Sequence, residues 1–121
     1  MTNKILVALT VALFCFASSL HAQTKPPSES AMVRFLRYIK VDTQSAEEAG
    51  KYPSTEKQLV LARMLETELK ALGVQDVRIS KEGIVYAQVP GNLPDNSKVP
   101  TIGFIAHMDT SPAVSGANVN A

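Results

Sequence analysis

Residues 101–112 read TIGFIAHMDTSP, and this stretch decides how we interpret the rest of the chain. Apolar side chains dominate residues 102–106, and a His-x-Asp pair, His107 and Asp109, follows at once. Pro112 then discourages any further strand. A short apolar run that ends in polar residues and a proline predicts a strand buried on both faces of a sheet. His107 would follow the carboxyl end of that strand, where open α/β sheets place their ligands.

The types and spacing of His107 and Asp109 suit a metal site. A neutral imidazole nitrogen binds zinc, and a carboxylate either binds the metal or orients the ring. In an extended segment, side chains two residues apart point to the same face, so both can serve one site. One His and one Asp supply at most half of a zinc site, and the same pair also occurs in ordinary loops. On the residues alone, both interpretations stay open.

Three segments together resemble one known family. They are RYIKVDTQS at 37–45, YPSTEKQ at 52–58 and AHMDTSP at 106–112, the last with GFI before it and SGANVN after it. In this order and at these distances they resemble the peptidase T family of tripeptide aminopeptidases, a branch of the zinc-dependent aminoacylase and carboxypeptidase superfamily. The superfamily as a whole shares only His-x-Asp, so the Thr-Ser-Pro that follows is the more specific part of the match.

The resemblance implies a fold and a metal centre. The fold is α/β, with residues 31–121 as the amino-terminal part of a layered zinc-peptidase catalytic domain whose mixed central sheet is flanked by helices. The centre holds two zinc ions, with His107 as a metal ligand and Asp109 in a supporting catalytic role. A zinc-activated water attacks the scissile carbonyl, and a glutamate beyond this chain transfers the proton.

The same resemblance implies the partners and the activity. The substrate is a short peptide, from which the enzyme releases the amino-terminal residue, and a homodimer could form through a domain absent here. The remaining zinc ligands are also absent, so we expect this piece to be the front of a longer protein and inactive alone. Three alternatives stay open: a related secreted dipeptidase, an N-acyl amino acid deacylase, and a non-enzymatic binding domain of the same fold.

The first 22 residues have the layout of a secretory signal peptide. Lys4 precedes an apolar core at 5–17, and the small Ala22 is placed for cleavage. We therefore expect an exported protein, periplasmic or secreted, in which residues 23–30 form a linker. The apolar core is short for a membrane span, although an uncleaved amino-terminal anchor is the alternative.

Composition argues against two classes of partner. The 121 residues include 12 basic and 11 acidic side chains, and cleavage after Ala22 removes one lysine, which leaves the mature chain formally neutral. Without basic clusters, we expect neither nucleic acid nor an anionic membrane as a partner. Cleavage also removes Cys15, the single cysteine, so no disulfide can form within the mature chain.

Two amphipathic helices are expected before the central strand. The first follows a Ser28 or Ser30 cap, and the second begins with a Thr55–Gln58 capping box and ends at Gly73. Each has an apolar stripe that we expect to be core: Met32, Phe35, Leu36 and Ile39 in the first, and Leu61, Leu65, Leu69 and Leu72 in the second.

The remaining segments predict a hairpin and loops. Residues 74–80 and 84–89 alternate as two strands around a turn, and the proline-rich 90–100 is a surface connection. Glu47 and Glu48 lie in a polar loop, where adjacent positions diverge, so we interpret them as solvated rather than as an acid/base pair. Ser111 has no nucleophile elbow around it and is not expected to be a nucleophile.

Overall fold

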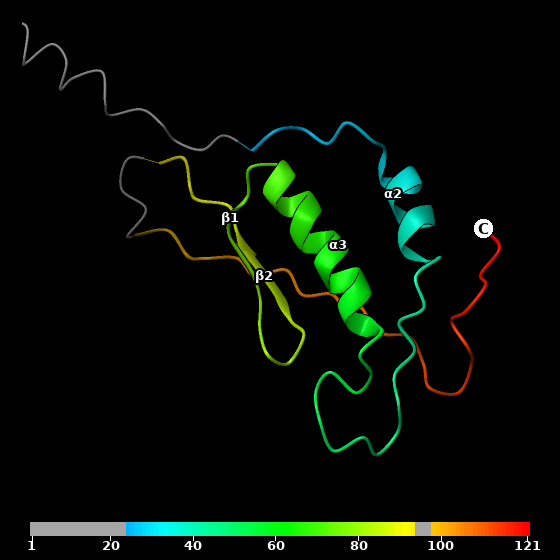
Figure 1. Ribbon diagram of the computed structural model, residues 1–121. Coiled ribbons are helices and arrows are strands. Elements are labelled where there is room, and N and C mark those ends of the chain that lie inside the picture. The colour runs from blue at the N-terminus through cyan, green and yellow to red at the C-terminus, as the bar shows by residue number, and fades with distance from the viewer. Residues whose placement is uncertain (1–23, 94–97) are drawn as a thin grey trace, which may run out of the picture.

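The structure is a computed structural model that describes residues 24–93 and 98–121. Its elements, in order, are helix α2 (Ala31–Tyr38), helix α3 (Gln58–Ala71), strand β1 (Gln75–Ile79) and strand β2 (Val85–Gln88). Figure 1 shows α3 lying along the β1–β2 hairpin, with α2 beyond its other side. The expected signal peptide at 1–22 lies outside the described residues.

Helix α2 begins where the sequence predicts. The Ser30 hydroxyl accepts a hydrogen bond from the Val33 main-chain N–H at 3.3 Å, which satisfies one of the free donors of the first turn. The prediction that its apolar stripe is core is wrong for these residues, because Met32 and Phe35 are exposed and Leu36 and Ile39 are only half-buried. Among residues 24–93 and 98–121, too few helices and strands are present to cover this face of a two-turn helix.

Helix α3 begins later than expected, and the predicted capping box does not form. The Thr55 hydroxyl donates to the Gln44 carbonyl at 2.8 Å, and the Gln58 side chain donates to the Ser54 hydroxyl at 3.0 Å. Both groups therefore bond to nearby loop atoms instead of capping each other, and a turn at residues 56–57 precedes the helix.

The end of α3 agrees with the sequence. Gly73 has φ +78°, a left-handed conformation that glycine adopts without steric cost. The Val74 N–H donates to the Leu69 carbonyl at 3.1 Å and the Gly73 N–H donates to the Lys70 carbonyl at 3.0 Å. These two bonds define a Schellman motif, which satisfies carbonyls that would otherwise be free at the helix end.

The predicted hairpin is present. Strands β1 and β2 pair antiparallel, with Arg78 opposite Tyr86 and Ile79 opposite Val85. Val77 and Ile79 are half-buried while their neighbours in β1 are exposed, so the alternation expected of a strand with one covered face is confirmed. Gly83 makes the turn at φ +83°.

The expected buried strand at 102–106 is absent, and this is the main correction to the sequence analysis. The segment has no regular secondary structure, and the side chains of Phe104 and Ile105 are 96% and 100% exposed. A strand needs neighbours for its backbone hydrogen bonds and for both of its faces. Among the described residues the sheet consists of β1 and β2 alone, and residues 102–106 pair with neither.

The core of the described chain is small. Leu61 and Ala62 are its buried apolar residues, whereas Leu65, Leu69 and Leu72 of the predicted α3 stripe are only half-buried. Helix α3 packs on the hairpin, and Glu68 ties it to α2 by ion pairs with Arg34 and Arg37. The chain thus has helices and a small antiparallel sheet, in keeping with a mixed α and β class.

Two helices, α2 and α3, lie within residues 24–93 and 98–121. Neither α2 nor α3 combines the length and the apolar character that crossing a bilayer requires.

Candidate functional site

The structure brings the two predicted site residues, His107 and Asp109, together. The imidazole Nδ1 of His107 lies 2.8 Å from the main-chain carbonyl oxygen of Asp109 and 3.4 Å from its carboxylate Oδ1. One residue therefore offers the ring two acceptors, and the main-chain carbonyl is the closer one.

This contact decides which ring nitrogen of His107 carries the proton. A carbonyl oxygen can only accept, so a hydrogen bond to it requires a proton on Nδ1. In the neutral ring, Nε2 then keeps its lone pair, as a metal-binding imidazole requires. The His107 side chain is 85% exposed, so Nε2 is open to a ligand from outside.

A large hollow lies beside this pair. Its volume is about 930 Å³, and its lining is contributed by α2, α3, the turn of the hairpin and residues 106–110. Leu61, Leu65 and Leu69 line it, and His107 and Asp109 also belong to its lining. An apolar concavity with a few polar groups is the usual form of a small-molecule site, although here it also marks a core face that the described residues leave uncovered.

A loop far away in sequence holds the segment that carries this pair. The Thr110 N–H donates to the Thr43 carbonyl at 3.2 Å, and the Ser45 N–H donates to the Thr110 carbonyl at 3.0 Å, which together form a short parallel bridge. The Ser45 hydroxyl reaches the same carbonyl at 2.8 Å, and the Gln44 side chain donates to the Pro112 carbonyl at 2.9 Å. We call residues 42–45 the clamp loop.

The clamp loop is itself anchored to the start of α3. Lys57 donates to the Asp42 carboxylate at 2.9 Å and to the Gln44 side-chain oxygen at 3.2 Å. The Asp42 carboxylate also accepts the Gln44 N–H at 3.0 Å. The hydrogen bond from Lys57, and then the one from Gln44, hold the pKa of Asp42 below its ordinary value. Asp42 is therefore an ionised anchor at neutral pH.

Three other acidic or nucleophilic residues were candidates from the sequence, namely Glu47, Glu48 and Ser111. Glu47 and Glu48 are exposed, in agreement with their interpretation as solvated loop residues. Ser111 accepts a hydrogen bond from the Ala113 N–H within its own turn. Among residues 24–93 and 98–121, no three His, Cys, Asp or Glu side chains gather as a metal centre would need.

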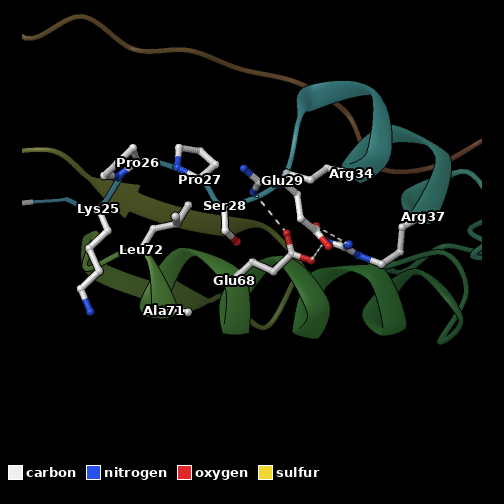
Figure 2. A pocket seen from close by; sticks show the side chains of 10 residues that line it. All are labelled: Lys25, Pro26, Pro27, Ser28, Glu29, Arg34, Arg37, Glu68, Ala71 and Leu72. Carbon is white, nitrogen blue, oxygen red and sulfur yellow. Dashed lines mark hydrogen bonds and ion pairs between the residues drawn. The ribbon is translucent and has the colours of Figure 1, made fainter.

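A second, smaller hollow of about 260 Å³ lies between the linker, α2 and α3 (Figure 2). Two cations of its lining are paired, since Arg34 and Arg37, together with Tyr38, donate to the Glu68 carboxylate. Partial desolvation raises the pKa of Glu68, but these hydrogen bonds outweigh it and leave the pKa below its ordinary value. This cluster joins two helices, and we assign it a structural role.

Sequence reasoning identified the His107 and Asp109 pair but missed the clamp loop. Its hydrogen bonds to Thr110 are mainly main-chain bonds between residues about 65 positions apart. Main-chain bonds do not depend on residue type, so the sequence does not reveal them. Two signals were available: residues 42–45 lie within the segment 37–45 that carries part of the family resemblance, and an Asp side chain, here that of Asp42, often accepts the N–H two residues on.

The chain is similar in sequence to known peptidase T proteins. Peptidase T of Desulfitobacterium hafniense (strain Y51) is 60% identical over 92 residues, and peptidase T of Clostridium botulinum (strain Hall / ATCC 3502 / NCTC 13319 / Type A) is 53% identical over 92 residues. These matches cover 76% of this chain. The resemblance to peptidase T is confirmed.

This chain corresponds to only part of peptidase T. The matched region spans 22% of the length of these curated relatives. No protein-family profile matches the chain.

Proposed function

We propose that this chain is part of a zinc-dependent aminopeptidase that releases the amino-terminal residue of tripeptides. The observation that supports the proposal most is the His107 ring, held at Nδ1 by Asp109 with Nε2 open at the edge of an apolar hollow. Sequence similarity supports the proposal too, since peptidase T relatives are 51–60% identical to the chain over 92 residues.

His107 is the proposed zinc ligand. Imidazole nitrogen binds zinc at about 2.0–2.1 Å, and the acceptor on the other nitrogen fixes the ring and raises its basicity. The Asp109 carbonyl supplies that acceptor at 2.8 Å, and the nearby Asp109 carboxylate adds negative charge at 3.4 Å. Asp109 is thus proposed to position the ring and tune the site rather than to bind the metal itself.

Two bound zinc ions would supply an activated water as the nucleophile. The described residues bring too few ligands together for a centre of this kind, so the others are assigned to the longer protein. The chain alone is accordingly proposed to be inactive.

The proposed fold follows from apolar side chains that the described residues leave uncovered. Phe104 and Ile105 are fully or almost fully exposed, and the α3 stripe opens onto the 930 Å³ hollow. Burying a Leu, Ile or Phe side chain is worth about 1.5–3 kcal/mol, so a longer protein gains from covering these faces. We infer a layered domain in which a mixed sheet and its flanking helices cover these faces.

The substrate and location complete the proposal. A short peptide fits a concave site, and the layout of residues 1–22 supports the proposal that the protein is exported. Fractionation of expressing cells and sequencing of the mature amino terminus test export. A product that begins at Gln23 supports it, and an intact Met1 on a soluble cytoplasmic product contradicts it.

The activity is tested with a chimera. The 92 matched residues of Desulfitobacterium hafniense peptidase T are replaced by the corresponding residues of this chain, and the purified protein is assayed with tripeptides, dipeptides and N-acyl amino acids. Bound zinc is measured by elemental analysis before and after dialysis against a chelator.

The expected result is tripeptide hydrolysis that disappears with the zinc and returns when zinc is restored. A folded chimera that binds no zinc and hydrolyses none of the three substrates would favour a binding domain.

A further inference from the structure

The peptide group that joins Asp109 to Thr110 is held at both ends. Its carbonyl, that of Asp109, lies 2.8 Å from His107 Nδ1, and its N–H, that of Thr110, donates to the Thr43 carbonyl at 3.2 Å. A peptide group is planar, so fixing the direction of its N–H also fixes the direction of its carbonyl. The orientation of the acceptor for His107 is therefore set from the clamp loop.

The clamp loop can act as a rigid reference. Thr43 is only 2% exposed, which keeps water away from the residue that holds the Thr110 N–H. The loop is fixed to the start of α3 by the Lys57 bonds to Asp42 and Gln44 and by the Thr55 hydroxyl, which donates to the Gln44 carbonyl at 2.8 Å. The backbone at 101–109, which has no regular secondary structure, thus gains a fixed point at Thr110.

We propose that Gln44 and Ser45 are positioning residues that, through Thr110 and the Asp109 carbonyl, keep the proton of His107 on Nδ1 and leave Nε2 free for a metal. The inference rests on the proposed function for its purpose, but the tautomer itself is a property of the chain without metal. Ser45 holds the Thr110 carbonyl through both its N–H and its hydroxyl, and Gln44 holds Pro112.

The test is nitrogen NMR of the imidazole rings in the 121-residue chain, at a pH high enough to keep the rings neutral. The His21 signals are assigned with a His21→Gln variant. The double variant Gln44→Ala/Ser45→Ala removes both side-chain contacts, whereas Ser111→Ala removes a hydroxyl from the same segment that bonds only within its own turn. Cross-strand contacts between Arg78 and Tyr86 report that each variant is folded.

The chain and the Ser111→Ala control should both show His107 mainly with Nδ1 protonated. The double variant should shift the ring toward the Nε2-protonated form, and Ser45→Thr, which keeps the hydroxyl, should retain the original tautomer. If the double variant does not fold, Ser45→Ala alone serves, with a smaller shift in the same direction. An unchanged tautomer in a folded clamp variant overturns the proposal.

Zinc affinity separates this inference from the proposed function. In the chimera, the double variant should lose about 10–100-fold in zinc affinity, as when the hydrogen-bond partner of a ligand is removed. Full zinc affinity in that variant overturns the positioning role. A parent chimera that binds no zinc refutes the proposed function, while the tautomer measurement still decides the role of the clamp loop.

Discussion

Replacing Leu61 with Ala should destabilise the chain far more than replacing Leu65 with Ala. Leu61 is 8% exposed, whereas Leu65, one turn along α3, is half-buried at the open hollow. Each substitution removes three carbons, worth about 0.8 kcal/mol apiece when buried, or about 2.4 kcal/mol for Leu61. A cavity penalty adds to this, so we expect about 2–4 kcal/mol for Leu61 and about 1 kcal/mol for Leu65.

Urea titration followed by helical circular dichroism measures both losses. With a slope of about 1 kcal/mol per molar urea for a small domain, the midpoint should fall by about 2–4 M for Leu61→Ala. Domains of this size have only about 5–15 kcal/mol of stability, so this loss removes a large share of it. Equal losses at the two positions, or less than about 0.5 kcal/mol at Leu61, would show that our account of the core is wrong.

Two further predictions concern charge and backbone conformation. The pKa of Glu68 is lower in the folded chain than its ordinary value of 4.5, so its contribution to stability is present above that pH and is lost as the pH falls through the folded value. Glu68→Gln should therefore flatten the loss of stability between neutral and acidic pH, and an unchanged pH profile in thermal melts would contradict the ion cluster. Gly83→Ala should cost about 1–2 kcal/mol for its left-handed φ of +83°, plus a contact penalty because the new Cβ would lie 3.3 Å from that of Pro53. Gly50→Ala, at φ +61° with nothing within 4 Å, is the matched control, and an equal loss at both glycines would exclude the contact penalty.

Local signals in the sequence predicted much of the local structure. The Ser30 cap, the Gly73 stop and the hairpin each depend on a few neighbouring residues, and all three are present. The Thr55–Gln58 capping box does not form, because the Gln44 carbonyl, which belongs to an earlier loop, accepts the hydrogen bond of the Thr55 hydroxyl instead. Such competition is decided by tertiary contacts, which no local pattern reports.

Burial was predicted less well than secondary structure. An apolar run such as 102–106 indicates what a segment can bury, but the burial itself depends on other strands and helices. Phe104 and Ile105 stay exposed because the described residues provide no partner strand and no covering layer. The His107 and Asp109 pair was predictable from residue type and spacing, whereas the clamp loop depends on main-chain bonds that only the structure displays.

We propose that His107 is a zinc ligand, and metal content measured together with activity tests this. His107→Ala and Asp109→Ala are made in the chimera with Desulfitobacterium hafniense peptidase T, and each protein is assayed for bound zinc and tripeptide hydrolysis. Removing a ligand deletes a bond to the metal, while removing the Asp109 carboxylate leaves that bond and the main-chain carbonyl in place. We predict that His107→Ala loses both zinc and activity, and that Asp109→Ala keeps more zinc while its turnover falls by about 10–100-fold. Full zinc and full activity in His107→Ala would contradict the account and make this histidine an ordinary loop residue.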